Sequence, residues 1–379
     1  MNRAGIYIDN LAGEATYQSF KPNPLPPIPG IIMDEEIVRL IVDANRQLVK
    51  LDTASQLIPN GDMFISMYVR KEALISSQIE GTQCTLDDIL DPDVETNANL
   101  DVSDVINYVK ATQYALERLE NFPLCCRLLR EVHEILMNGV RGQEKNPGEF
   151  RHSQNWIGSA NCSLKDARYI PPNVEDMQNA MSDLEKYMNE NVEYDPLIRV
   201  ALIHYQFETI HPFLDGNGRI GRLLILLYLM EQGLICKPVI YISYFLKKNQ
   251  IEYYDRISEV RRTGNFEQWI KFFLEAVSKA ASDSLESIGK LTRLHDKNIE
   301  KLPKSSRSKD NLRLVFDYIE QYPIIDIKKT AKDLQISYNT AATAVKKLVE
   351  LGIVRETTNA TRNRVFAYEE YLEILRKDT

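Results

Sequence analysis

Residues 223–230, which read LLILLYLM, restrict the fold more than any other part of the chain. A helix of this composition has almost no polar face, so it is stable only when other elements cover it. The run is also far shorter than the roughly 20 apolar residues that a membrane-spanning helix requires. We therefore expect a helix buried in the core of a globular domain.

Apolar residues recur at helical spacing through most of the chain, which predicts a mainly helical, all-α fold. The expected helices span residues 34–51, 63–80, 102–119, 123–137, 174–188, 196–210, 217–231, 246–262 and 266–284. The runs 155–157 and 168–170 flank a polar stretch, which indicates a small β-hairpin over residues 155–170. The proline-rich residues 20–30 favour an extended arm.

The last part of the chain has the pattern of a separate domain. Residues 302–310 combine proline, serine and alternating charges, which is typical of a linker. Expected helices at 312–321, 327–334 and 338–351 are followed by short apolar runs at 353–355 and 364–367. This is the order of a winged helix-turn-helix domain. We therefore predict an N-terminal helical region at 1–100, a helical core at 101–285, a helical extension and linker at 286–310, and the winged helix at 311–379.

The bulk properties exclude several classes of protein. The chain of 379 residues has a net charge of −8, which disfavours extensive coating of nucleic acid. Its five cysteines are irregularly spaced, without a CxxC pair or a histidine cluster, which indicates reduced thiols and no zinc site. Because the N-terminus lacks the pattern of a signal peptide, we expect a cytoplasmic protein without membrane contact.

Residues 211–222, HPFLDGNGRIGR, contain an acid and a base suited to phosphate chemistry. Histidine has an ordinary pKa near 6.5, so His211 can accept a proton from a hydroxyl near neutral pH. Asp215 offers the hard oxygen that Mg²⁺ prefers, and Mg²⁺ commonly bridges one or two carboxylates and substrate phosphates. These two side chains are candidates for a catalytic base and a metal ligand.

The same segment predicts a phosphate site at a helix end. The helix begins near Asn217, so its unpaired N–H groups and its dipole favour an anion there. Gly216 and Gly218 allow close approach of the backbone and a positive φ. Arg219 and Arg222 are three residues apart and can reach one side of the anion.

Two other phosphate-binding motifs fit less well. The glycines at 216, 218 and 221 match the dinucleotide fingerprint, but that motif follows a β-strand, and here the preceding segment is a predicted helix. A Walker A loop requires Gly-Lys-Ser/Thr, which the segment lacks.

The segment resembles the signature of the Fic family, HPFx(D/E)GNGRxxR, at every specified position. The resemblance implies an enzyme that transfers AMP from ATP, with Mg²⁺, to a Tyr, Ser or Thr hydroxyl of a target protein or of itself. His211 would be the base, Asp215 would hold the metal, and Arg222 would bind the γ-phosphate. The residues implied to line the nucleotide here are His211, Gly216, Asn217, Gly218, Arg219, Ile220, Gly221 and Arg222.

A second motif of the same family matches residues 76–81, SSQIEG, which fit the inhibitory pattern (S/T)xxxE(G/N). Ser76 and Glu80 are four residues apart and lie on one helix face, and Gly81 follows the helix end. By resemblance, Glu80 pairs with Arg222 and blocks productive binding of the γ-phosphate. Alone, Glu80 would be interpreted as a solvated carboxylate.

Two further regions resemble parts of Fic enzymes. The predicted hairpin is similar to the flap that aligns a target by adding a strand, and its candidates are Trp156, Ile157, Tyr169 and Ile170; an ordinary surface hairpin is the alternative. Candidates for the adenine pocket are Tyr241, Lys248, Asn249, Tyr253 and Tyr254, although core packing explains any single tyrosine equally well. We expect His204 to be a packed histidine that binds no ligand.

The C-terminal domain leaves a rival hypothesis open. Tyr338, Lys346 and Lys347 could enter a DNA groove, with Arg362 and Arg364 on the wing, but the charges of the domain are nearly balanced. Protein docking or a homodimer is an equal alternative. Three alternatives to the adenylyltransferase therefore remain open. They are a DNA-binding regulator with a nucleotide-sensing Fic domain, a Fic enzyme that uses another donor, and a Fic enzyme that removes AMP.

Overall fold

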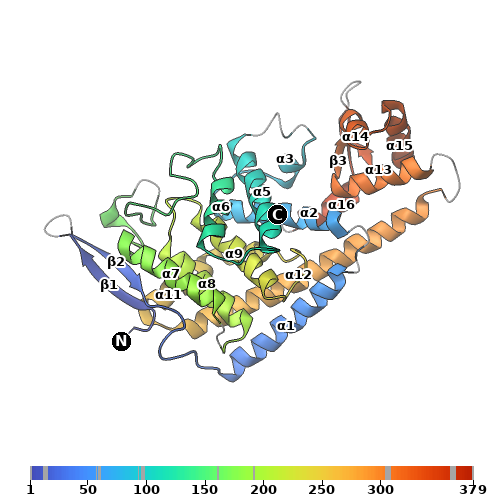
Figure 1. Ribbon diagram of the computed structural model, residues 1–379. Helices are drawn as coiled ribbons and strands as arrows, with labels where there is room; N and C mark the ends of the chain where they lie inside the picture. Colours follow the sequence, from blue (N-terminus) through green and yellow to red (C-terminus); the bar gives the residue numbers. More distant parts are fainter. Residues whose placement is uncertain are drawn as a thin grey trace. The chain divides into compact units, whose positions relative to one another are not determined.

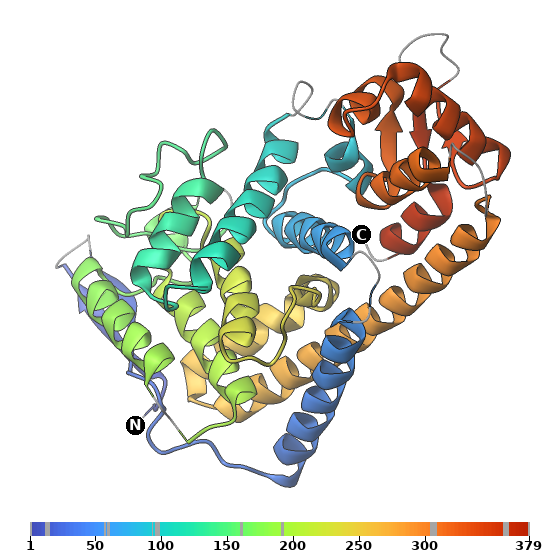
Figure 2. The same ribbon diagram turned by 45° about the vertical axis from the view of Figure 1, so that its right-hand side comes forward.

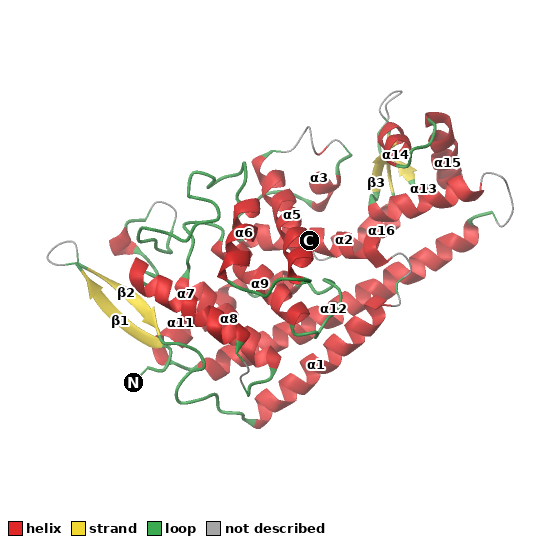
Figure 3. Cartoon of the chain, viewed as in Figure 1, coloured by secondary structure: helices red, strands yellow, loops and turns green. Residues whose placement is uncertain are grey.

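The structure is a computed structural model that describes residues 2–11, 16–56, 58, 61–92, 94, 99–159, 162–190, 193–303, 309–358 and 364–377. These residues are mainly helical, with two small sheets, as Figure 3 shows, and the all-α prediction is confirmed. They form two compact units. The first unit contains Met1–Val49, Asn107–Cys236 and Phe245–Ala280, and the second contains Lys50–Ile106, Lys237–Tyr244 and Ala281–Thr379.

The helices follow the predicted pattern closely. In chain order they are α1 (Glu35–Gln56), α2 (Gly61–Ile79), α3 (Leu86–Leu90), α5 (Leu100–Leu119), α6 (Cys126–Leu136), α7 (Val174–Asn189), α8 (Pro196–Ile210), α9 (Asn217–Glu231), α10 (Ile242–Lys248), α11 (Gln250–Thr263), α12 (Phe266–Lys301), α13 (Lys309–Gln321), α14 (Ile327–Asp333), α15 (Tyr338–Glu350) and α16 (Glu369–Arg376). The predicted domain boundaries stay a prediction.

The core of the first unit is built around α8 and α9, which pack directly against each other (Figure 1). All of α8 after Pro196 is buried, and α9 is buried from Arg219 to Leu229. Gly221 permits the close approach, because a Cβ at this position would lie 3.2 Å from the ring of Phe207 in α8. With α6 and α7 also packed on this pair, the predicted buried helix is confirmed.

A hairpin that the sequence analysis did not include opens the chain. Strands β1 (Gly5–Asn10) and β2 (Tyr17–Pro22) pair antiparallel, from Gly5 opposite Pro22 to Asn10 opposite Tyr17. Strand β2 contacts α7 and α8 and buries Phe20 completely. The hairpin therefore covers one side of the central helices.

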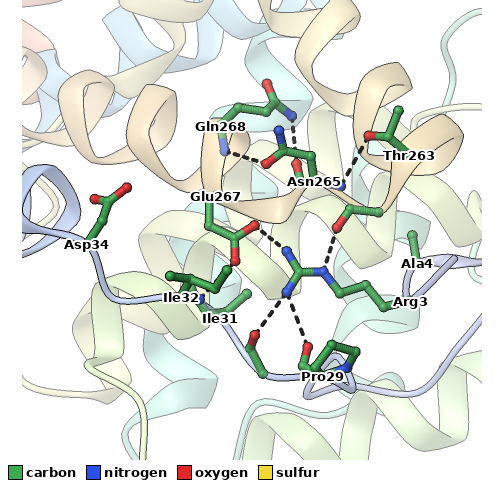
Figure 4. A network of polar contacts seen from close by, with 12 residues as sticks. Arg3, Ala4, Pro29, Ile31, Ile32, Asp34, Thr263, Asn265, Glu267 and Gln268 are labelled. Atoms are coloured by element: carbon green, nitrogen blue, oxygen red, sulfur yellow. Dashed lines mark hydrogen bonds and ion pairs between the residues drawn. The ribbon is translucent and has the colours of Figure 1, made fainter. Parts of the chain in front are cut away.

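Arg3 anchors this N-terminal segment to the turn before α12 (Figure 4). Its Nε donates to the carbonyl of Gly264 at 2.6 Å, and one terminal nitrogen donates to the carbonyl of Pro29 at 3.2 Å. The other terminal nitrogen pairs with the carboxylate of Glu267, which also accepts the backbone N–H of Ile32 at 2.9 Å. One guanidinium thus joins three segments of the first unit.

Two predicted elements differ from the structure. The single helix expected at 246–262 is two helices, because Asn249 leaves helical geometry and its side chain donates to the carbonyl of Phe245 at 2.9 Å. The hairpin expected at 155–170 is reduced to one antiparallel bridge between Ile157 and Tyr169. A one-turn 3-10 helix at Leu164–Asp166 lies between the paired residues.

In the second unit, the C-terminal elements follow the predicted order with one strand added (Figure 2). Strand β3 (Ile324–Asp326) precedes α14, and β4 (Arg355–Glu356) and β5 (Val365–Ala367) follow α15. The sheet order is β3-β5-β4, and α13 also packs on α2. The assignment as a winged helix stays a prediction, and the wing residue Arg362 lies outside the described residues.

Candidate active site

His211 ends α8 in an unusual backbone conformation. Its φ of 51° and ψ of 60° are left-handed, which is uncommon for residues other than glycine and is found preferentially at functional sites. Its N–H donates to Phe207 at 2.9 Å. Its carbonyl accepts hydrogen bonds from Arg151 Nε and Asn155 Nδ2, both at 3.1 Å. These contacts hold the backbone on both sides of the half-buried histidine.

The loop after His211 is braced from within. The side chain of Asn217 accepts the N–H of Phe213 and donates to its carbonyl, both at 2.8 Å. The backbone N–H of Arg151 donates to Pro212 at 2.9 Å. The Asn217 side chain is thus committed to the loop.

Helix α9 begins immediately after this loop. Gly216 is its N-cap with a φ of 73°, and no side chain among the described residues caps the helix. A Cβ on Gly216 would lie 3.0 Å from Met137 Sδ, so glycine is required for both reasons. Gly218 is helical, and the positive φ expected there is wrong. The uncapped helix end is suited to an anion.

Asp215 is partly exposed beside this helix end. Its carboxylate accepts the N–H of Gly216 at 2.7 Å and pairs with Lys145 Nζ at 2.8 Å, while Arg219 lies 3.9 Å away. Burial raises the pKa of Asp215, but Lys145, the Gly216 N–H and Arg219 outweigh it, so the pKa lies below its ordinary value. An ionised carboxylate that already attracts cations fits the predicted metal ligand.

Among the described residues, no group of three or more His, Cys, Asp and Glu side chains could hold a metal ion. Within the same described part of the chain, no helix combines the length and apolarity needed to cross a membrane.

His133 is a buried site residue that the sequence analysis missed. Its Nδ1 accepts the N–H of Gly148 at 2.9 Å, so its Nε2 carries the proton and donates to the carbonyl of Asp215 at 3.1 Å. Its ring stacks on Phe213 at 3.8 Å. Burial, together with the charge of Arg219, lowers the pKa of His133 to about 4, so it is neutral near pH 7. Within an amphipathic helix it has no distinguishing sequence signal.

The remaining signature residues are buried along α9. Arg219 is 6% exposed, with its terminal nitrogen 3.4 Å from Met137 Sδ, and Arg222 is 1% exposed. The Ile220 side chain is buried as well. The carbonyl of Gly221 accepts a hydrogen bond from His204, so Gly221 serves helix packing.

His204 has the expected structural role. Its other ring nitrogen bonds to Tyr253 Oη at 2.8 Å, and its side chain is fully buried. Burial lowers its pKa to about 3. The expectation of a packed histidine is confirmed.

The predicted flap is anchored to the end of α8. Tyr169 is 7% exposed, and its hydroxyl donates to the carbonyl of Thr209 at 2.7 Å. The guanidinium of Arg261 lies 3.6 Å from the ring centroid of Tyr169 and donates to Thr209 Oγ1 at 3.1 Å. The carbonyl of Ile170 accepts the N–H of Phe20 in β2 at 3.0 Å. The flap is therefore linked to the turn that carries the proposed base.

The opposite strand of the flap is more open. Trp156 is 42% exposed, and its indole N–H donates to the carbonyl of Cys162 at 3.0 Å. Ile157 forms both hydrogen bonds of the bridge, to Tyr169, at 2.8 and 3.1 Å.

Two of the candidates for the adenine pocket line one hollow. Lys248 and Asn249 line a hollow of about 770 Å³ along α10 and α11, which residues 211–222 do not line. Tyr254 is half-buried, with its ring 4.9 Å from that of Tyr253. Tyr241 belongs to the second unit and is 1% exposed, with Lys71 Nζ 4.5 Å from its ring centroid. Core packing accounts for Tyr241.

The candidate inhibitory residues lie at the end of α2 in the second unit. Ser76 is fully buried, whereas Glu80 is exposed. Gly81 has a φ of 95° and donates its N–H to Gln78 at 3.1 Å, which ends the helix. The pairing of Glu80 with Arg222 stays a prediction.

Comparison with known families agrees with this site. Residues 123–229, which include His211 and the start of α9, match the Fic/DOC family. The chain is a Fic-domain protein. Residues 38–117 match the N-terminal region of the Fic/DOC family. This segment of the chain includes α2 and residues 76–81.

Curated relatives of this Fic-domain protein carry the name protein adenylyltransferase Fic. The protein from Culex quinquefasciatus is 30% identical over 187 residues, and that from Aedes aegypti is 29% identical over 187 residues. The aligned region covers 49% of this chain and 33% of each relative. The chain thus spans about a third of the length of these relatives.

Solved structures show the same fold. A Fic family protein from Desulfovibrio desulfuricans G20 superposes with a TM-score of 0.58 over 89% of this chain and 97% of that protein, at 18% identity. A Fic domain containing signaling protein from Bacteroides thetaiotaomicron gives a TM-score of 0.50 over 68% of this chain and 97% of that protein, also at 18% identity.

Proposed function

We propose that this Fic-domain protein is a protein adenylyltransferase that transfers AMP from ATP to a hydroxyl side chain of a target protein. The observation that carries the proposal is the arrangement of His211, Asp215 and the uncapped start of α9 on one braced loop. The names of the curated relatives support the same activity.

In the proposed reaction, His211 accepts the proton of the target hydroxyl. The hydroxyl oxygen forms a bond to the α-phosphorus of ATP, and the bond between that phosphorus and pyrophosphate breaks in line. The backbone N–H groups of residues 217–219 and the Arg219 guanidinium stabilise the charge on the phosphates. Arg219 is buried, and the backbone carbonyl of His211 is held by Arg151.

Asp215 would hold Mg²⁺, and the ion would supply positive charge that neutralises the phosphates of ATP. The low pKa of Asp215 keeps its carboxylate ionised for this role. Lys145 and Arg219 hold the Asp215 carboxylate beside the helix end. His133 holds the backbone carbonyl of Asp215.

We propose that the protein restrains itself through Glu80. By resemblance, this carboxylate pairs with Arg222. The pairing occupies the guanidinium that would otherwise bind the γ-phosphate. The burial of Ser76 on the same helix supports a precise placement of the motif. Loss of the Glu80 carboxylate is therefore expected to activate the enzyme.

We propose that the target docks as an added strand on the edge at residues 155–158. On the other strand, the carbonyl of Ile170 is already bonded to Phe20. Among the described residues, the backbone N–H and carbonyl of Trp156 have no hydrogen-bond partner. The open edge is thus the one that carries Trp156.

The test is mass spectrometry of the Glu80→Gly protein incubated with ATP and Mg²⁺. The expected result is an added AMP on a hydroxyl residue, which the additional change His211→Ala abolishes. A parallel incubation with UTP as the sole donor tests whether the enzyme transfers UMP in place of AMP. An active-state variant that adds no nucleotide from either donor would contradict the proposal.

A further inference from the structure

The second unit contains a hollow that the proposed reaction does not use. It lies between α2, the end of α3 and the elements α13, β3 and α14, and it has a volume of about 710 Å³. This size is typical of sites for small organic ligands. The lining includes Arg70, Leu90, Tyr318, Tyr322, Lys328 and Lys332. We refer to it as the α2–α14 pocket.

Arg70 is the central feature of this pocket. The guanidinium donates to Ser66 Oγ at 2.9 Å and lies 5.7 Å from the ring centroid of Tyr322. It forms no ion pair with any described residue. Burial lowers the pKa of Arg70, because it is energetically unfavourable to bury a cation without a carboxylate partner. An anion in the pocket would offset that cost.

The lining as a whole carries a net positive charge, because four cations, Arg70, Lys328, Lys329 and Lys332, face three carboxylates, Asp91, Asp326 and Asp333. Lys328 and Lys332 are four residues apart on α14, both exposed, and neither pairs with a carboxylate in the described part of the chain. The nearby acids are already engaged: Asp326 caps α14, and Asp333 accepts the hydroxyl of Tyr318 at 2.7 Å. Asp91, on the opposite wall, has a bonding partner as well.

An aromatic and apolar surface lies beside these cations. The rings of Tyr318 and Tyr322 are 4.8 Å apart, and Leu90 and Ile325 are largely buried below the pocket. Such a surface binds a planar organic group, while a guanidinium binds phosphate oxygens bidentately.

We propose that the α2–α14 pocket binds a small organic phosphate. Arg70 and the two α14 lysines hold the phosphate group, and the tyrosine pair holds the organic part. The site contains residues of α2 and of the C-terminal elements, so the ligand bridges the two. Because α2 ends in the Ser76–Glu80 motif, the ligand also alters the freedom of that helix. Only this last consequence rests on the proposed function.

The test is isothermal titration of the full chain with phenyl phosphate, which combines an aromatic ring and a phosphate. Arg70→Met should weaken binding about tenfold or more, as expected for the loss of charged hydrogen bonds. The double change Lys328→Met and Lys332→Met should weaken it several-fold without disturbing the fold, because both side chains are exposed. Lys346→Met on α15, equally exposed, is the matched control and should bind as the unchanged protein does.

Inorganic phosphate and benzyl alcohol are the two partial probes. Each should bind more weakly than phenyl phosphate, because each lacks one of the two recognised parts. The proposal is overturned if phenyl phosphate does not bind, if inorganic phosphate binds equally well, or if Arg70→Met leaves binding unchanged. Binding that is lost in Arg219→Met but kept in Arg70→Met assigns the ligand to α9 and also overturns it. None of these readouts requires AMP transfer.

Discussion

Acidification should destabilise the first unit through His133. This buried imidazole has a pKa of about 4 in the folded protein, against about 6.5 in an unfolded chain. Between these values the unfolded state binds more protons, so the free energy of unfolding falls as the pH falls from 6.5 toward 4. The difference corresponds to a loss of about 3 kcal/mol from this residue.

The change His133→Gln isolates this contribution. Glutamine does not titrate and can still donate to the carbonyl of Asp215, but it leaves the N–H of Gly148 without its acceptor. The variant should therefore be about 1–3 kcal/mol less stable at pH 7. Because it lacks the acid-dependent loss, its unfolding free energy should approach that of the unchanged protein near pH 4.

Urea unfolding followed by tryptophan fluorescence measures this effect, since both tryptophans of the chain, Trp156 and Trp269, belong to the first unit. His152→Gln, at an exposed histidine, is the control and should follow the unchanged protein at every pH. Buried His204 adds its own acid-dependent loss in all three proteins. If the curves of His133→Gln and the unchanged protein stay parallel from pH 7 to 4, the reasoning is refuted.

Three further predictions concern packing, charge and the flap. Gly221→Ala should lower the melting temperature, because overpacking costs about 1–3 kcal/mol and exceeds the gain in helix propensity of about 1 kcal/mol. Gly289→Ala is the control: its new methyl group meets only ordinary contacts, so the melting temperature should rise by about 2–4 °C. Asp215→Asn should reduce AMP transfer about 100-fold or more in a radiolabel assay and remove its dependence on Mg²⁺ concentration; full activity would contradict the role of the carboxylate. Arg261→Met should lower kcat about tenfold with little change in the KM for ATP, since it removes the guanidinium above Tyr169 but no proposed phosphate ligand. An unchanged kcat would show that the contact of Arg261 with Tyr169 does not affect catalysis.

Much of the fold was predictable because helices depend on short-range spacing. The buried character of α9 follows from residues 223–230, and the end of α2 follows from Gly81. The error at residues 246–262 has a local cause that periodicity does not detect, since the Asn249 side chain competes for the backbone. The flap was overestimated because its strands pair at a single position.

The sequence alone determined the parts of the candidate site that are neighbours along the chain: a histidine, a carboxylate and a helix end within residues 211–222. Only the tertiary structure brought in His133 and Lys145, which contact this loop across 82 and 70 positions of the chain. The physical reason is that spacing along one helix or turn sets which side chains share a face, whereas contacts between distant segments depend on how the helices pack. Packing made His133 neutral and oriented Asp215, and no pattern in the chain indicates either.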